Sequence, residues 1–450
     1  MPKNTDIQIK NLRTGLEQIQ YRTPIKFGGR VVDDVTLFNI EIEVETTDGR
    51  RGIGTGSMPV GNAWGWPSDT ESGDRTLDAM IQYGELCAQD TAQCSDRGHP
   101  LELMHDLQTT FSTRAQQLIT TMQLQEPIPK LAQLVATSPI DAALHDAYGK
   151  TLDENSYNLL SSAFMNRDLG HYLQGELAGQ FLDEFTLREP KSSMALYHLV
   201  GALDALSEID VQTPIHDGIP ETLGAWILAD GLTHLKIKLA GDDLSWDVQR
   251  VVEIDQVATE AQQQRGCNQW YYSTDFNEKC ENVQYVLEFL AKLKESAPAA
   301  FDRIQYIEQP THRDLKSHPG NVMHAAAEIK PVVIDESLID LESLFLAREQ
   351  GYSGVALKAC KGHGEALMMG AVAQHYNLFL CVQDLTCIGA SFLHSASLAA
   401  RIPSIAAIEG NGRQYCPLGN APWVESFPSM FDVTQGVVGT HCLTGPGLGF

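Results

Sequence analysis

Five charged residues recur through the second half of the chain, and each of them closes a short apolar stretch. Successive members stand 37, 33, 27 and 23 positions apart, an interval that accommodates a loop, a helix and a strand. Repeated βα units of this kind close into a barrel, and the ends of all the strands meet at one mouth. We therefore expect these side chains to converge there: Lys238, Asp275, Glu308, Asp335 and Lys358.

The three acids of this series offer only oxygen atoms as ligands. Carboxylate oxygens suit Mg²⁺, and a bound cation would relieve the repulsion among three acids at one mouth. Asn277 and Glu336 stand close to the first and third acid in the sequence, where they could orient these ligands from a second layer. The alternative is that Asp275, Glu308 and Asp335 form three independent salt bridges or helix caps.

The lysines indicate proton transfer. Lys236 and Lys238 stand two apart on one predicted strand, so both side chains point to the same face. Charges on the inward face of a barrel strand are costly without charged partners, which the acids would provide. A free lysine has a reference pKa near ~10.4, so a base at Lys238 or Lys358 needs a nearby cation that lowers its pKa. The alternatives are a wet edge strand for the pair and a surface position for Lys358.

Composition limits the class of protein. With 450 residues, of which 43% are hydrophobic, the chain can hold two domains or one large barrel with additions. Its net charge of −26 argues against nucleic acid or an anionic membrane as a partner, because both attract basic surfaces. Nine cysteines without a Cys-x-x-Cys pair, a polar N-terminus and the lack of a membrane-spanning apolar run predict a cytoplasmic protein.

The N-terminal part predicts a sheet followed by helices. Residues 35–46 alternate apolar and polar side chains, Asp48-Gly49 favours a hairpin, and residues 51–54 begin a partner strand. From about Glu71 to Gly149 the apolar residues recur at helical spacing.

Alternating strands and helices begin near residue 195, with a helix predicted at 283–293. Asp384 and Glu409, at the ends of the seventh and eighth strands, are further candidates for substrate contact. The eight predicted strands lie at 196–200, 235–239, 270–274, 304–307, 332–334, 355–357, 378–382 and 405–408. The predicted division is an α+β region at 1–150, a poorly periodic connecting segment at 151–194, a barrel at 195–410 and a C-terminal segment at 411–450.

As an ordered set, several motifs make the chain resemble the enolase superfamily. A Lys-x-Lys pair on the second barrel strand and a lysine on the sixth resemble its muconate-lactonizing subgroup, whereas a His-Asp dyad would mark the mandelate racemase subgroup. Leu385-Thr386-Cys387 and His363 depart from the subgroup's pattern. The motifs are Lys-Ile-Lys (236–238), Asp-Phe-Asn (275–277), Ile-Glu-Gln-Pro (307–310), Ile-Asp-Glu-Ser (334–337) and Ala-Leu-Lys-Ala-Cys-Lys-Gly (356–362), together with 139–146 and 445–449.

The resemblance implies an α/β barrel, a modified TIM barrel (β/α)7β, with an α+β N-terminal capping domain that the C-terminal tail completes. It implies one Mg²⁺ per subunit and no other cofactor, with Lys238 and Lys358 facing each other across a small-molecule carboxylate. The implied enzyme is an isomerase or lyase that removes an α-proton to give a metal-stabilised enolate, which Lys236 also holds. Racemisation, epimerisation, cycloisomerisation or dehydration would follow, and we expect a homo-oligomer.

Substrate selection would come from two capping loops, at residues 23–29 and 57–66. Trp64 and Trp66 could wall an aromatic or apolar substrate, or else anchor the loop or an oligomer contact. Lys26 could meet a distal acid group, although a surface lysine is the simpler interpretation.

Two other functions stay open at this point. A Schiff-base aldolase would use Lys238 or Lys358 in a barrel, but it would not need three carboxylates at metal spacing. A barrel kept as a ligand-binding or assembly scaffold would not need the full set of lysines and acids.

Overall fold

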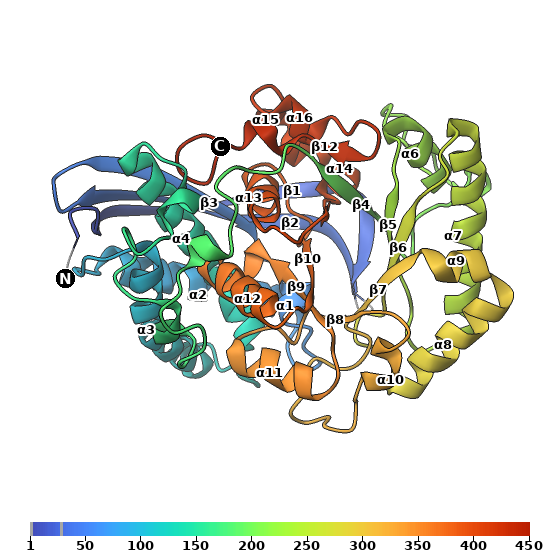
Figure 1. The fold of residues 1–450 in the computed structure, drawn as a ribbon, viewed down its shortest axis with the longest axis horizontal. Helices are drawn as coiled ribbons and strands as arrows, with labels where there is room; N and C mark the ends of the chain where they lie inside the picture. Colours follow the sequence, from blue (N-terminus) through green and yellow to red (C-terminus); the bar gives the residue numbers. More distant parts are fainter. Residues whose placement is uncertain (1–2, 28–29) are drawn as a thin grey trace.

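A closed barrel of eight parallel strands occupies the second half of the chain in the computed structural model, which describes residues 3–27 and 30–450 (Figure 1). Each strand pairs with the next, and the last pairs with the first through Ile408 and Leu196. The predicted fold class is confirmed. The strands are β4 (Met194–Val200), β5 (His234–Lys238), β6 (Tyr271–Asp275), β7 (Ile304–Glu308), β8 (Val332–Ile334), β9 (Gly354–Lys358), β10 (Phe379–Gln383) and β11 (Ala407–Glu409).

Helices surround the barrel and shield its strands from solvent (Figure 1). Among the described residues, no helix combines the length and the apolarity that crossing a membrane requires. The surrounding helices are α6 (Leu223–Asp230), α7 (Leu244–Arg265), α8 (Val283–Ser296), α9 (Pro298–Arg303), α10 (His324–Ala327), α11 (Leu341–Glu349), α12 (His363–His375) and α13 (Ala390–Arg401).

The barrel interior changes from apolar to polar along the strands. Because side chains alternate along a strand, every second residue points inward. One layer of inward residues is apolar. On four of the strands, the next inward residue, two positions closer to the carboxyl end, is charged: these residues are Glu308, Asp335, Lys358 and Glu409. Charged groups are thereby confined to one mouth. The apolar layer beneath them consists of Tyr197, Tyr306, Val333, Ala356, Cys381 and Ala407.

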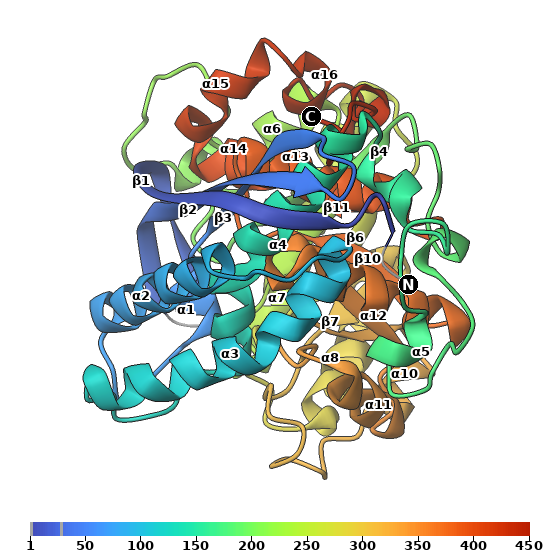
Figure 2. The same cartoon turned by 90° about the vertical axis from the view of Figure 1, so that its left-hand side faces the viewer.

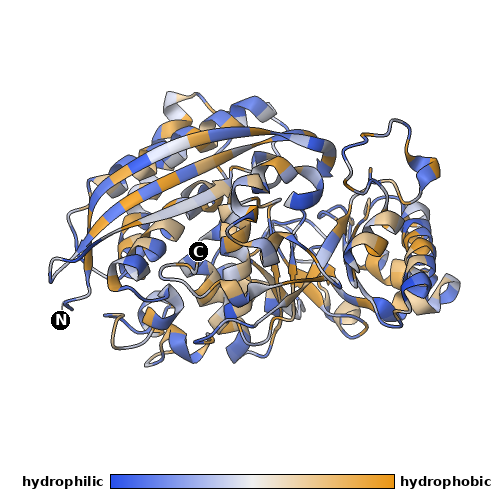
Figure 3. Cartoon of the chain, turned by 90° about the horizontal axis from the view of Figure 1, so that it is seen from above, coloured by the Kyte–Doolittle hydropathy of each residue, from blue (hydrophilic) through white to orange (hydrophobic). Residues whose placement is uncertain are grey.

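Residues 7–152 form a three-stranded antiparallel sheet with helices packed against it (Figure 2). Gly49 adopts a φ of 91° in the predicted hairpin, a conformation that glycine takes without strain. Residues alternate in hydropathy along the two long strands (Figure 3). The strands are β1 (Ile7–Phe27), β2 (Arg30–Thr46) and β3 (Arg51–Pro59), and the helices are α2 (Gly73–Ala92), α3 (Pro100–Thr121) and α4 (Lys130–Leu152).

Two glycines let α4 lie directly on β3. A Cβ atom on Gly54 would stand 2.1 Å from the backbone nitrogen of Ala147, and one on Gly56 would stand 2.0 Å from the carbonyl oxygen of Pro139. No side chain fits at either position, so the sequence Gly-Thr-Gly sets the distance between helix and sheet.

The connecting segment and the C-terminal tail tie the two halves together. Asn166 donates to Glu102 of α3 at 2.8 Å, while the N–H of Leu187 donates to the carbonyl of Arg401 at the end of α13 at 2.7 Å. In the tail, the N–H of Leu448 donates to Asp146 of α4 at 3.0 Å. We retain the division at residues 150, 194 and 410 as a proposal, which these contacts support.

Candidate active site

The five charged residues of the predicted series lie together at the barrel mouth. Lys238 is the register partner of Asp275, which in turn is the partner of Glu308 on the next strand. Asp335 directly follows β8, and Lys358 ends β9. Each of them is more than nine-tenths buried, although charged groups avoid the interior unless they are paired.

Lys236 lies at the centre of this cluster. Its Nζ is 2.8 Å from Glu308 Oε1, 3.0 Å from Glu409 Oε2 and 3.2 Å from Asp275 Oδ2. Burial disfavours the ammonium, but these three carboxylates hold the pKa of Lys236 well above its ordinary value. Lys236 is therefore a fixed positive charge.

The other two lysines approach from opposite sides. β5 and β9 are four strands apart in the closed barrel of eight. Lys238 donates to Asp275 and, at 3.0 Å, to Asn277 Oδ1. Lys358 Nζ lies 2.7 Å from Asp335 Oδ2. Burial would lower the pKa of Lys358, but the Asp335 carboxylate raises it above its ordinary value, whereas the sequence argument requires a lowered one.

Acids outnumber lysines at the mouth. Burial and the charge of Asp275 raise the pKa of Glu308 well above its ordinary value. Burial and the charge of Glu409 do the same for Asp384. Six buried carboxyl groups meet four buried ammonium groups, and the raised pKa values of Glu308, Glu336 and Asp384 show that a full set of negative charges is disfavoured without a further cation. The acids are Asp275, Glu308, Asp335, Glu336, Asp384 and Glu409, and the lysines are Lys236, Lys238, Lys358 and Lys361.

Asp275, Glu308 and Asp335 fit a hard divalent cation in their chemistry. They supply only oxygen donors from three neighbouring strands, and the buried acids of the mouth outnumber its buried lysines by two. As the side chains stand within residues 3–27 and 30–450, no three acidic, histidine or cysteine side chains surround a common cation position. Lysine ammonium groups lie against the acids instead, so the acids would exchange these partners for the cation.

Trp64 extends from the capping domain over the mouth. Its Nε1 donates to Glu336 Oε1 at 2.8 Å, and the ammonium of Lys358 lies 4.3 Å from the centroid of its ring. Burial and the nearby charge of Asp335 raise the pKa of Glu336 to about 8. Trp64 thus contacts both a predicted base and a predicted neighbour of the metal ligands.

Trp66 is not brought to this cluster. Its Nε1 donates to Glu126 at 2.6 Å, and its side chain is 1% exposed within the core of the capping domain. Trp66 anchors the loop, which is the alternative that the sequence leaves open.

Asp384 and Glu409 both reach the mouth. Asp384 Oδ2 accepts from the N–H of Cys387 at 3.2 Å, and its Oδ1 is buried without a hydrogen-bond partner among the described residues. Glu409 contacts Lys236 through one oxygen and accepts from Asn411 at 3.2 Å through the other.

Three further residues complete the mouth without a prediction from the sequence. Lys361 Nζ lies 3.1 Å from Asp335 Oδ1. Gln309 Oε1 accepts from the N–H of Asp335 at 2.9 Å, and Gln383 donates to Glu308. Each of the three stands within three positions of a predicted site residue, and this proximity is the signal that could have identified them.

A cavity leads from Lys238 and Asn277 to the outside. Its other walls come from Lys26 of β1, from α7 and from the loop after β4. Because the cavity reaches a predicted base, it is the candidate entrance for a substrate. In the first predicted capping loop, Lys26 lines this cavity, while Gly28 and Gly29 lie outside the described residues.

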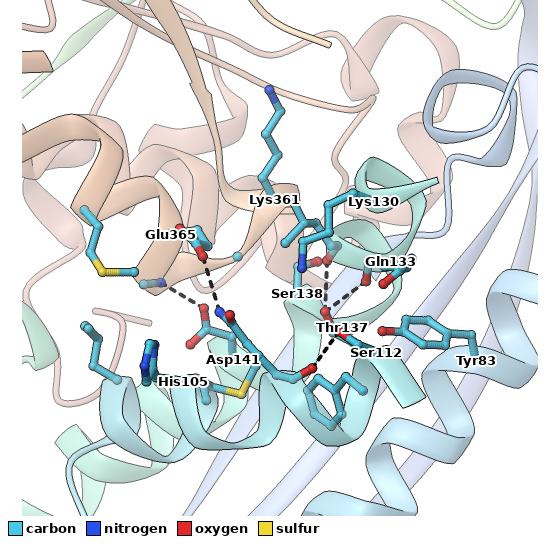
Figure 4. Close-up of a pocket in the computed structure, with 18 residues that line it drawn as sticks. Tyr83, His105, Ser112, Lys130, Gln133, Thr137, Ser138, Asp141, Lys361 and Glu365 are labelled. Atoms are coloured by element: carbon cyan, nitrogen blue, oxygen red, sulfur yellow. Dashed lines mark hydrogen bonds between the residues drawn. The ribbon is translucent and has the colours of Figure 1, made fainter. Parts of the chain in front are cut away.

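A different cavity lies behind the mouth, between α3, α4 and α12 (Figure 4). Lys361 borders it, but the ammonium of this lysine extends away toward Asp335. Asp141 Oδ2 accepts from the N–H of Gly364 at 2.8 Å and thereby caps the start of α12. The residues that line this cavity include none of the predicted site residues.

His363, which departs from the family pattern, lies in a group of four buried imidazoles. The ring centroids of His99 and His145 are 5.8 Å apart, those of His145 and His363 are 4.5 Å apart, and those of His363 and His394 are 5.2 Å apart. His363 Nδ1 and His394 Nε2 form a 3.0 Å hydrogen bond. Burial lowers the pKa of both, that of His394 to about 4. This group joins the capping domain to the barrel.

Known proteins resemble this chain in sequence and in fold. Residues 220–450 match the family described as Enolase C-terminal domain-like. A dipeptide epimerase from Enterococcus faecalis V583, complexed with Mg and the dipeptide L-Leu-L-Tyr, has a TM-score of 0.62 at 16% identity, over 98% of this chain and 99% of that chain. Muconate lactonizing enzyme from Pseudomonas fluorescens, complexed with muconolactone, has a TM-score of 0.59 at 17% identity, over 98% and 95%. No curated protein sequence matches the chain.

Proposed function

Because the chain belongs to the Enolase C-terminal domain-like family, in the mandelate racemase and muconate lactonizing enzyme group, we propose that it is an isomerase or lyase acting on a small-molecule carboxylate. The first step would remove the proton from the carbon next to the carboxyl group. Racemisation or epimerisation is the outcome that the site supports best.

The placement of two lysines carries this proposal. Lys238 and Lys358 end strands that are four apart in a closed barrel of eight. A substrate held between them presents opposite faces of its α-carbon to the two amines. One lysine can then remove the proton on one side while the other returns a proton on the opposite side.

The protons balance over one turnover. A neutral lysine takes the α-proton and becomes an ammonium, and the opposite ammonium gives a proton to the other face and becomes neutral, so the configuration is inverted. Lys236 remains charged and faces the negative charge that develops on the carboxyl oxygens. Asp384, whose pKa is raised by burial and by Glu409, would donate a hydrogen bond in its protonated form.

Asp275, Glu308 and Asp335 would hold the cation. When bound, Mg²⁺ supplies positive charge opposite the oxygens on which negative charge develops. A cation held by Asp335 would place positive charge close to Lys358 and would weaken the attraction of this carboxylate for the ammonium, and both effects would lower the pKa of Lys358 toward the range of a base.

Deuterium exchange tests the assignment. The protein is incubated with Mg²⁺ and a panel of carboxylates in deuterated water, and mass spectrometry follows exchange of the α-proton. Lys238→Ala and Lys358→Ala should each slow the reaction by about 10²–10⁴-fold. Lys316→Ala is the matched control, because its ammonium pairs with Glu342 on the surface. Exchange at the wild-type rate in both mouth variants would remove these lysines from the mechanism.

The same first step also permits cycloisomerisation or dehydration, and the products formed from the panel distinguish these outcomes. A Schiff-base aldolase would instead be trapped covalently by borohydride with a carbonyl substrate. A scaffold without catalysis would show no Mg²⁺ uptake by calorimetry.

We further propose one Mg²⁺ per subunit, a homo-oligomeric assembly and a cytoplasmic location. Each of the nine cysteines, all within the described part of the chain, is a free thiol, which supports a reducing compartment. Sedimentation analysis and metal quantification test the first two proposals.

A further inference from the structure

A long bulge in β1 carries Arg22 out of the capping sheet. Between Gln20 and Ile25 the register with β2 slips, so that β1 advances five residues while β2 advances two. Pro24, inside this stretch, has no N–H to contribute to a ladder and suits a bulge. A bulge re-aims the side chains that it carries. Arg22 consequently points toward the barrel.

The guanidinium of Arg22 forms hydrogen bonds with the loop that joins β4 to α6. Its Nε and Nη2 donate to the two carboxylate oxygens of Asp217 at 2.6 and 3.0 Å. It also donates to the carbonyls of Ile219 at 3.0 Å and Pro220 at 3.3 Å. The Arg22 side chain is 7% exposed, and its hydrogen bonds lower the pKa of Asp217 to about 2.

This contact differs from an ordinary surface ion pair. On the same strand, Arg13 lies 3.4 Å from Glu41, with side chains that are 73% and 45% exposed. Exposed pairs of that kind contribute little, whereas a bidentate guanidinium–carboxylate pair with additional acceptors fixes both partners in one geometry.

The two joined segments are also two walls of the substrate cavity. Lys26 stands four positions after Arg22 on β1, and Leu203 belongs to the loop after β4. Both line the cavity that reaches Lys238. The β1–β2 hairpin of the capping domain is called the capping hairpin here. Its position relative to the loop after β4 therefore determines the shape of the cavity.

We propose that Arg22 and Asp217 are positioning residues. Their ion pair, called the clasp here, fixes the capping hairpin to the loop at 201–222 and closes the outer wall of the cavity that leads to Lys238. Loss of this ion pair opens the wall. An intact ion pair keeps the wall closed and increases the affinity for a substrate. The kinetic consequence rests on the proposed function, whereas the structural consequence stands without it.

Hydrogen–deuterium exchange tests the clasp directly. Asp217→Asn preserves the size of the side chain and removes its charge, while Glu41→Gln is the matched control for loss of an acid that faces an arginine of β1. In Asp217→Asn, exchange at 20–26 and 201–222 should accelerate about tenfold, the factor expected when charge-assisted hydrogen bonds are lost. Glu41→Gln should exchange like the wild type. Unchanged exchange at both segments in Asp217→Asn would overturn the proposal.

Kinetics separate positioning from a merely structural role. With a substrate found by the exchange assay, Asp217→Asn should raise KM about tenfold and leave kcat within about twofold, because no proton-transferring group is touched. Arg22→Lys, which keeps the charge but loses the fork, should give the same pattern. A lower melting temperature with unchanged KM and unchanged local exchange would overturn the clasp. If the wild type shows no activity, the proposed function fails, and hydrogen–deuterium exchange still decides the clasp.

Discussion

Replacing one buried histidine should change how stability depends on pH. Burial lowers the pKa of His394 from 6.5 to about 4. Between these values the unfolded chain carries a proton that the folded protein does not, so the free energy of unfolding falls as the pH falls. Each pH unit in this window costs about 1.4 kcal/mol. From pH 7 to pH 5, His394 alone should therefore reduce stability by about 2 kcal/mol.

The variant His394→Gln isolates this contribution, because an amide can still bond to His363 but does not titrate. Equilibrium urea unfolding, followed by tryptophan fluorescence, gives the free energy of unfolding for both proteins at pH 7 and pH 5. We expect the advantage of the wild type over the variant to shrink by about 2 kcal/mol at the lower pH. The exposed His441→Gln is the control, and its curve should run parallel to that of the wild type.

The reasoning fails if His394→Gln keeps the same difference from the wild type at both pH values. That result would mean that the folded protein accepts a proton on His394 as readily as the unfolded chain does. Burial among three other imidazoles would then not hold this ring neutral.

Four further predictions concern packing, the mouth and the cation. Gly56→Ala should destabilise the protein by about 3 kcal/mol because its Cβ would collide with the backbone of α4, whereas Gly15→Ala, with nothing within 4 Å, should stay within about 0.5 kcal/mol; thermal unfolding compares them. Trp64→Phe keeps an aromatic ring near Lys358 but loses its N–H donor, so we expect KM to rise while kcat changes less than about threefold. Removing divalent cations with a chelator should abolish α-proton exchange, and Mg²⁺ should restore it. Glu308→Gln should weaken Mg²⁺ binding by more than about tenfold in calorimetry, since one of three charged ligands is lost.

Sequence reasoning located the barrel strands because each has a buried, apolar character and a similar distance to the next. The strand β1 was not predicted, although it spans Ile7–Phe27. It is an edge strand with many exposed residues on both faces, among them Arg13 on one face and Thr14 on the other. Its alternation of apolar and polar residues is interrupted by two register shifts, between Ile9 and Asn11 and between Gln20 and Ile25, so no long run of period two marks this strand in the sequence.

At the mouth, residue type and strand position sufficed to place the acids and lysines, but their pairing did not follow from them. Lys358 was expected to have a lowered pKa, and it is raised because its closest acid is Asp335. Which acid a lysine meets depends on side-chain directions that a list of strand ends does not contain. Lys361 shows the same limit, because it contacts the same carboxylate from a turn outside the strand.

The proposed division between chemistry and selectivity has a physical origin. In the proposed mechanism, proton transfer depends on residues at strand ends, which the regular repeat of the barrel places without reference to the rest of the chain. The proposed shape of the substrate cavity depends on the contact between Arg22 and Asp217, which are 195 positions apart. Their contact arises from a bulge in an edge strand that faces an irregular loop, and neither segment has a periodic pattern. The spacing of residues in the sequence therefore predicts which side chains meet at the barrel mouth. The shape of the cavity cannot be predicted in this way, because it depends on a three-dimensional contact between two irregular segments.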